Sequence, residues 1–214
     1  MLMISTRARG RSTGFALITA LVMLLVITLL AIGGARLAID SKRMSRNQRD
    51  TDIAFQAAEA ALRDAEYDIQ NASAGNGSAT NTRSAIFDPT KATGFPGSGC
   101  NTGGPGTATP YQGLCQPAPD GATGVWNTVS WSASGTPQTA GFGDFTGRTF
   151  PTGTGLLPAQ KPRYIIEILP DRTIGGNVQG PATFLYRITA VGWGPNLGAQ
   201  VMLQSVYRKT DAPG

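Results

Sequence analysis

Residues 14–35 of the chain read GFALITALVMLLVITLLAIGGA, and this stretch decides the fold. Its last 21 residues, 15–35, contain no charged side chain. A helix of that length is about 30 Å long, which matches the hydrocarbon core of a bilayer. The stretch therefore predicts a helix that can span a membrane once.

The residues before this stretch distinguish it from a secretory signal. Three arginines precede it: Arg7, Arg9 and Arg11. A secretory signal has an apolar core of roughly 7 to 15 residues, followed by small residues at the cleavage site. The present core is longer and ends in GGAR at 33–36, whereas Gly14 stands directly in front of Phe15. A cleavage site before the apolar run fits this pattern better.

A short basic leader that ends in glycine, followed by phenylalanine and a long apolar helix, resembles the class III signal of type IV pilins and pseudopilins. In that family a prepilin peptidase of the inner membrane cuts after the glycine and methylates the new amino terminus. The resemblance implies a leader of residues 1–14, cleavage between Gly14 and Phe15, and N-methylation of Phe15. The alternative is an uncleaved single-pass anchor.

The fifth residue of the expected mature chain departs from the family pattern. Most pilins carry a glutamate there, which neutralises the terminal ammonium of a neighbouring subunit, but this chain has Thr19. An unpaired charge in apolar surroundings costs on the order of several kcal/mol. The threonine hydroxyl can instead bond a backbone carbonyl one turn earlier, near Phe15. We therefore expect a low-copy subunit with no other subunit above it, at the filament tip.

Composition limits the classes of partner and the amount of regular structure. The formal charge of +5 over 214 residues falls to +2 without the three leader arginines, which is too small to indicate a nucleic-acid partner. Gly (28) and Pro (14) make up about a fifth of the chain, so long loops are expected.

The charges around the apolar stretch do not favour the orientation of a pilin. More basic residues follow it than precede it: Arg36, Lys42, Arg43, Arg46 and Arg49. The positive-inside rule would place that side in the cytoplasm. The leader resemblance is more specific, and two cysteines suggest an oxidising compartment. We therefore expect a single-pass protein of the inner membrane of a Gram-negative bacterium, with a periplasmic C-terminal domain that later reaches the pilus.

Residues 37–70 contain neither proline nor glycine and predict that the helix continues through 36–70. Its first turns, 40–50, are polar nearly all round, and such a segment is solvated or contacts other proteins. A helical stripe becomes apolar in its second half, where Phe55, Leu62 and Ile69 are expected to pack on a sheet. The whole stripe is Met44, Gln48, Thr51, Phe55, Ala58, Leu62, Ala65 and Ile69.

Residues 71–162 predict a variable loop region. The helix is expected to end near Asn71, where small turn-forming residues begin. A disulfide between Cys100 and Cys115 is expected to stabilise this region by roughly 3 kcal/mol, the alternative being two free thiols. The segment VWNTVSW at 125–131 is interpreted as a short strand, and 132–162 as a long exposed loop with aromatic anchors.

Three strand signals lie within 163–208: RYIIEIL (163–169), TFLYRITAV (183–191) and QVMLQSVYR (200–208). They are rich in β-branched and aromatic residues, and their short connections predict an antiparallel meander. In the second strand Phe184, Tyr186 and Ile188 alternate with more polar neighbours, so this face is expected to meet the helix. The fold class is α+β: a long N-terminal helix on a small antiparallel sheet, with long Gly/Pro-rich loops.

Both ends of the chain resemble pilus assembly proteins of the PilX type. The similar segments are AFQAAEAALR (54–63), PRYIIEIL (162–169), YRITAVGWG (186–194) and VMLQSVYRK (201–209), and 71–160 has no counterpart. The resemblance implies a minor pilin that helps to initiate type IV pilus assembly. Its partners would be other minor pilins, the major pilin, the inner-membrane assembly platform, the prepilin peptidase and a tip adhesin.

Two other functions are compatible with these features. A type II secretion pseudopilin shares the leader and helix, although the Gly/Thr-rich middle does not indicate the large helical insertion of the largest pseudopilin. A singly anchored periplasmic binding or adhesive protein would keep its leader and need no pilus machinery.

The residues for common enzyme chemistry are missing from the sequence. The chain has no histidine, which excludes Ser-His-Asp and Cys-His systems, and two cysteines alone make a poor metal site. The nearest glycine-rich match, GSGCNTGG at 97–104, follows no strand and opens no helix. We expect no enzyme, no cofactor and no metal.

Overall fold

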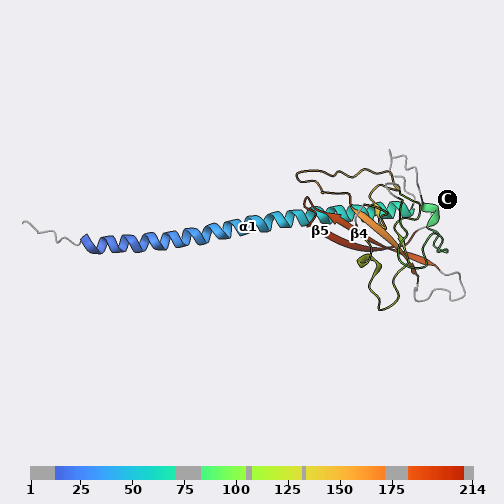
Figure 1. Cartoon of the computed structure of the whole chain (residues 1–214), viewed down its shortest axis with the longest axis horizontal. Helices are drawn as coiled ribbons and strands as arrows, with labels where there is room; N and C mark the ends of the chain where they lie inside the picture. Colours follow the sequence, from blue (N-terminus) through green and yellow to red (C-terminus); the bar gives the residue numbers. More distant parts are fainter. Residues whose placement is uncertain (1–12, 71–82, 105–107, 132–133, 172–182, 210–214) are drawn as a thin grey trace, which may run out of the picture. The chain divides into compact units, whose positions relative to one another are not determined.

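The computed structural model describes residues 13–70, 83–104, 108–131, 134–171 and 183–209 (Figure 1). One long helix, α1 (Thr13–Gln70), and a five-stranded sheet make up most of the regular structure, so the predicted α+β class is confirmed. The chain divides into two compact units, residues 1–47 and 48–214. The leader arginines and the loop predicted to begin at Asn71 lie outside the described residues.

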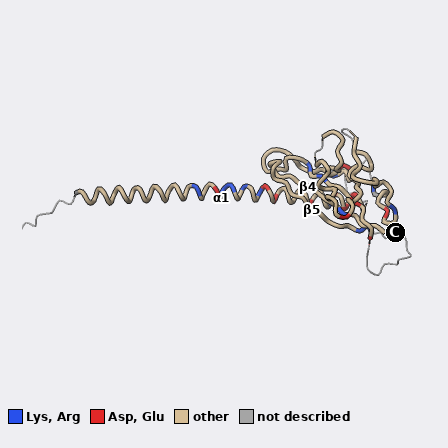
Figure 2. The backbone as a smooth tube through the Cα atoms, turned by 60° about the horizontal axis from the view of Figure 1, so that its bottom comes forward, with Lys and Arg blue, Asp and Glu red and all other residues tan. Residues whose placement is uncertain are grey.

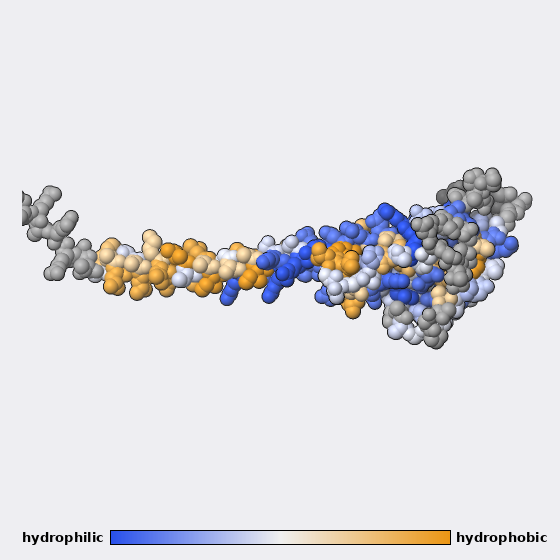
Figure 3. All heavy atoms as spheres, turned by 90° about the horizontal axis from the view of Figure 1, so that it is seen from above, coloured by the Kyte–Doolittle hydropathy of each residue, from blue (hydrophilic) through white to orange (hydrophobic). Residues whose placement is uncertain are grey.

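The first unit contains the N-terminal part of α1, and its side chains from Gly14 to Asn47 are exposed. Figure 3 shows apolar side chains along this part of the helix, followed by a polar segment. The helix is continuous through residues 36–70, as predicted, because no proline or glycine interrupts that stretch.

The second unit contains the sheet. Strands β3 (Arg163–Pro170), β4 (Phe184–Trp193) and β5 (Gln200–Tyr207) form the predicted antiparallel meander. β4 is the middle strand of the three, with Ile166 opposite Ile188 on one side and Ser205 opposite Ile188 on the other. The three strands begin and end within two residues of the expected positions.

The sheet as a whole is mixed, so the expectation of an antiparallel sheet is wrong beyond these three strands. β1 (Leu114–Cys115) pairs in parallel with β3, and β2 (Ala140–Gly141) pairs with it antiparallel. Each of these strands has only two residues, which is too short to produce an alternating pattern in the sequence.

The segment 125–131 is not a strand. Its beginning forms a 3₁₀ turn, Val125–Asn127, and the Val129 N–H and the Thr128 hydroxyl both donate to the Val125 carbonyl. The indole of Trp131 donates to the Trp126 carbonyl at 3.1 Å. These local bonds occupy backbone groups that a strand would use for pairing.

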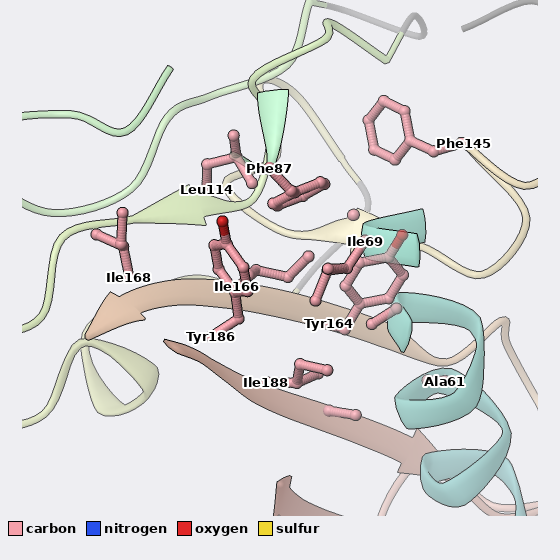
Figure 4. Packing of buried hydrophobic residues seen from close by; sticks show 13 residues of the cluster. Ala61, Ile69, Phe87, Leu114, Phe145, Tyr164, Ile166, Ile168, Tyr186 and Ile188 are labelled. Atoms are coloured by element: carbon pink, nitrogen blue, oxygen red, sulfur yellow. The ribbon is translucent and has the colours of Figure 1, made fainter. Parts of the chain in front are cut away.

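The main core lies between α1 and one face of the sheet (Figure 4). Alanines line the buried side of the helix, and tyrosines and isoleucines line the sheet, including Tyr164, Ile166, Tyr186 and Ile188. A Cβ on Gly192 of β4 would lie 2.3 Å from the Ala54 carbonyl oxygen, so helix and strand approach very closely there. Small side chains on both elements make this approach possible.

This close approach corrects one predicted packing residue. Ile69 is fully buried and Leu62 is half-buried against the core, but Phe55 is 46 % exposed. The contact face is instead formed by alanines at positions that the predicted stripe only partly includes: Ala54, Ala57, Ala58, Ala61 and Ala65. A phenylalanine between helix and strand would hold them apart.

The second face of the sheet carries a smaller core. Ile165 of β3 packs there with Cys115, Val125 and Val129, and all three of these partners come from the loop region 71–162. The predicted aromatic anchors of 132–162 are present, because Phe142 and Phe145 are buried, and Phe145 belongs to the main core on the helix side. The loops thus cover the sheet instead of extending freely from it.

Candidate functional site

The exposed apolar segment of α1 is the first candidate surface. It is the one helix in the described part of the chain that is long and apolar enough to cross a membrane. Its large side chains between Phe15 and Ile32 are 45 % to 75 % exposed. So large an apolar surface requires a lipid or protein environment.

The expected cleavage site and Thr19 lie at the start of this segment. The bond between Gly14 and Phe15 is in the first turn of α1, which begins at Thr13. The Thr19 hydroxyl lies 3.1 Å from the Phe15 carbonyl oxygen and 3.0 Å from that of Ala16. The predicted bond back to the preceding turn is therefore present, and the threonine needs no polar partner from a neighbour.

Basic residues follow the apolar segment on the same helix (Figure 2). Arg36, Lys42, Arg43, Arg46 and Arg49 are all exposed. The last four of these residues lie within 40–50 and make it a solvent-facing segment, as expected from its composition.

A buried ion pair joins the end of α1 to the loop region. The Arg83 guanidinium donates to both carboxylate oxygens of Asp68, with Nη2 to Oδ2 at 2.7 Å and Nε to Oδ1 at 3.1 Å and to Oδ2 at 2.9 Å. Both side chains are 1 % exposed. Arg83 also donates to the Gln112 carbonyl, and its guanidinium carbon lies 3.6 Å from the centroid of the Phe145 ring.

Tyr164 of β3 completes this cluster. Its hydroxyl donates to Asp68 Oδ2 at 2.9 Å. Burial, and then the negative charge of Asp68, raise the pKa of Tyr164 well above its ordinary value. The phenol is therefore a permanent donor at physiological pH and has the role of holding Asp68 in place.

One turn earlier on the helix, Asp64 holds the loop that follows β2. Its Oδ2 accepts the Gly143 N–H at 2.8 Å and its Oδ1 accepts the Thr146 hydroxyl at 2.5 Å. Burial raises the pKa of the Asp64 carboxyl above 3.8, although these bonds and Arg148 act in the opposite direction. Gly143 has φ +81°, and a Cβ there would meet the Arg148 carbonyl oxygen, so the turn requires glycine.

The predicted disulfide between Cys100 and Cys115 is confirmed. Cys115 is in β1 and is fully buried, so the bridge attaches the segment around Cys100 directly to the sheet. The described residues contain no free cysteine.

A groove of about 830 Å³ lies beside the disulfide-linked loop. Its border includes Arg187 of β4, which makes two bonds to the buried Glu167, at 2.9 and 2.7 Å. The guanidinium carbon of Arg187 also lies 4.5 Å from the Trp126 ring centroid. The charge of Arg187 is thus compensated by Glu167, and its side chain is held in place at the border of the groove.

These contacts are structural in their arrangement. No group of three or more His, Cys, Asp or Glu side chains that could hold a metal occurs among the described residues. The buried ionic groups contact one another and the backbone of loops. Their geometry serves to fix the loops on the helix and sheet.

Sequence reasoning missed Asp64, Asp68 and Arg83 as residues that organise the loops. Asp64 and Asp68 are four residues apart and stand on the same helical face as Ala61 and Ala65. Two acids on the apolar face of a helix indicate buried partners, because an unpaired buried carboxylate is very unfavourable. No comparable pattern indicates which basic residue would pair with them.

Two family models match the chain. The model described as PilX N-terminal matches residues 13–63, and the model described as Type IV pilus assembly protein PilX C-term matches residues 111–209. The second match begins at 111, so it includes β1, Cys115 and β2, which lie in the stretch where the sequence alone indicated no counterpart. No curated protein and no solved structure matches the chain.

Proposed function

The chain belongs to the PilX family of type IV pilus assembly proteins, and on that premise we propose that it is a minor pilin of a tip complex that initiates the pilus. Its exposed apolar helix is the element by which it would be held in the membrane and later packed in the filament core. The buried salt bridge, the loop contacts and the disulfide hold the C-terminal part together as a folded head.

The proposed position at the tip rests on Thr19, which stands where most pilins have a glutamate. In a filament core each terminal ammonium needs a negative partner, and the usual partner is the glutamate of the subunit below it. Thr19 supplies no charge, and its hydroxyl already bonds the carbonyls of Phe15 and Ala16. A subunit of this kind fits a position with no subunit above it, while its own Phe15 amine can still be paired from below.

In the proposed assembly pathway, the protein is first inserted in the inner membrane. The prepilin peptidase cuts between Gly14 and Phe15 and methylates Phe15. The head lies in the periplasm, where oxidising conditions form the Cys100–Cys115 bridge. The chain then joins other minor pilins on the assembly platform, the major pilin is added beneath them, and a tip adhesin is carried outward with the complex.

The test is to locate the protein on intact filaments. Immunogold labelling of sheared pili should place the label at one end. A strain with the gene deleted and pilus retraction disabled should have few pili. Label along the shafts, or normal pilus numbers in that strain, would refute the tip-initiation role.

A further inference from the structure

Strand β5 (Gln200–Tyr207) forms one edge of the sheet. It pairs with β4 and, among the strands that the structure describes, with no other. The opposite edge differs, because β1 and β2 both lie along β3 there. Within the described part, the protein covers one edge of its sheet with loop strands and leaves the eight residues of β5 without an outer neighbour.

The register determines which backbone groups of β5 face outward. The Gly194 N–H donates to the Ala199 carbonyl at 2.8 Å, so these two residues form a hydrogen-bonded pair. Hydrogen-bonded and non-hydrogen-bonded pairs alternate along antiparallel strands. Positions 201, 203, 205 and 207 therefore bond to β4. The N–H and C=O groups of the other four residues point away from it: Gln200, Met202, Gln204 and Val206.

The sequence of β5 has none of the features that commonly protect a sheet edge. It contains no proline, no glycine and no charged residue over eight positions. Exposed edges usually carry such residues, because a row of free backbone groups otherwise pairs with another chain. Two of the outward residues also expose apolar side chains, Met202 at 36 % and Val206 at 60 %.

A groove borders the same edge on the helix side. It has a volume of about 290 Å³ and is lined by Arg63, Glu66, Tyr67, Gln70 and Tyr207. Tyr207 is the last residue of β5, and its hydroxyl bonds the Gln70 side chain at 3.1 Å. A strand added to β5 would lie about 4.8 Å beyond it, with alternate side chains pointing toward the helix. The groove offers space for one such side chain, and its lining favours a polar one.

The geometry points to β5 as a docking edge to which a different pilus subunit adds an extended segment as a new strand. The outward N–H and C=O groups would bond its backbone, which selects an extended conformation more than a sequence. The occupant is a segment with alternating side chains, one of them polar and placed in the groove at Tyr207. The choice of a different subunit rests on the proposed function, in which this chain joins several distinct proteins at the tip.

Amide hydrogen exchange tests this inference. The full chain is measured alone in detergent micelles and in the complex co-purified with the other minor pilins of the same organism. In the chain alone, the amides of the four outward residues should exchange faster than those at 201, 203, 205 and 207. In the complex, these four amides should become protected.

Proline at Met202 provides the matched variant. Met202→Pro removes an outward N–H without removing a bond to β4, so the fold and the disulfide should persist while protection in the complex is lost. Met202→Ala keeps the N–H and should keep the protection. Met202→Pro should also cause loss of pili in a retraction-disabled strain.

The other outcomes overturn the inference. Equal exchange of the four amides in the chain alone and in the complex would show that no subunit docks there. Protection of these amides in the chain alone would also overturn the inference. If this protection depends on protein concentration, a second copy of the chain covers the edge; if it does not, another segment of the same chain covers it. Normal piliation with Met202→Pro, where gene deletion abolishes pili, would refute the docking edge and leave the proposed function intact.

Discussion

Tyr164 donates its hydroxyl to Asp68 at 2.9 Å across a sequence separation of 96 residues. The bond joins the last turns of α1 to the central part of the sheet, and Arg83 pairs with the same carboxylate from the loop region. A single buried acid therefore connects helix, loop and sheet. Its partners provide the first stability prediction.

Arg83→Ala should lower the free energy of unfolding by about 3 to 5 kcal/mol, because it leaves the Asp68 carboxylate buried with its cationic partner removed. Arg63→Ala is the matched control, since Arg63 forms an exposed pair with Glu59 at 2.6 Å. That control should lose less than about 1 kcal/mol. Chemical denaturation of the full chain in detergent measures both, and equal losses would contradict the special role of the buried pair.

Gly192→Ala should destabilise the second unit by roughly 1 to 3 kcal/mol through overpacking. The new Cβ would lie 2.3 Å from backbone atoms of Ala54 and Ala58, so the helix must move away from β4. Gly198→Ala is the control, because its nearest contact would be at 3.7 Å. Thermal unfolding monitored by circular dichroism should separate the two variants, and an unchanged midpoint for Gly192→Ala would contradict the close approach.

Replacement of both cysteines by serine should cost roughly 3 kcal/mol of stability, the value expected for a loop of this length. The two residues are 15 positions apart, and Cys115 is buried against Ile165. Denaturation of the wild type with and without reductant should show the same difference, while the double variant should not respond to reductant. Quantitative alkylation of both thiols in unreduced native protein would contradict the bond.

The stability of the wild type relative to Asp64→Asn should depend on pH. Burial raises the pKa of Asp64 above 3.8, so its charged form is disfavoured in the folded state. The nearby Asp68 charge also raises this pKa, whereas the Thr146 hydrogen bond and the Arg148 charge lower it. The folded protein then binds a proton more readily than the unfolded chain.

The sign of this effect follows directly. The penalty from Asp64 is fully present above its folded pKa and disappears below 3.8. As the pH falls from neutral, the wild type should gain stability relative to Asp64→Asn, because the other carboxylates are common to both proteins. Denaturation curves of both proteins at several pH values measure the difference, and a constant or opposite difference would contradict the raised pKa.

Gly14→Arg should block cleavage by the prepilin peptidase, because a large charged side chain replaces glycine beside the cut bond. Mass spectrometry of the wild type should give an N-methylated Phe15 as the first residue, whereas the variant should keep its full leader. Recovery of uncleaved wild-type protein from assembled pili would contradict the processing site.

The sequence was sufficient to predict elements with a strong local pattern. The helix through residue 70 and strands β3, β4 and β5 follow from uninterrupted helical or alternating patterns, and the two cysteines were enough to predict their bond. The two-residue strands β1 and β2 could not be predicted, because their pairing depends on β3 and not on their own residues.

The position of the helix on the sheet depends on the close contact between Gly192 and the helix backbone, which the helical sequence pattern does not reveal. Hydrophobicity favoured Phe55 as a contact residue, but Gly192 allows the helix backbone to approach the strand, and this approach favours alanines. The pairing of Arg83 with Asp68 was equally hidden, because it joins residues that become neighbours only after the chain folds.

The pairing of Arg83 with Asp68 also has an evolutionary and practical consequence. It fixes the described residues on either side of positions 71–82, so sequence changes between them need not alter the positions at which the chain leaves and rejoins the head. Loop-closure entropy grows slowly with length, and longer connections cost little. This position can therefore accept insertions during divergence between strains, and it is a natural place for an epitope tag or a displayed peptide.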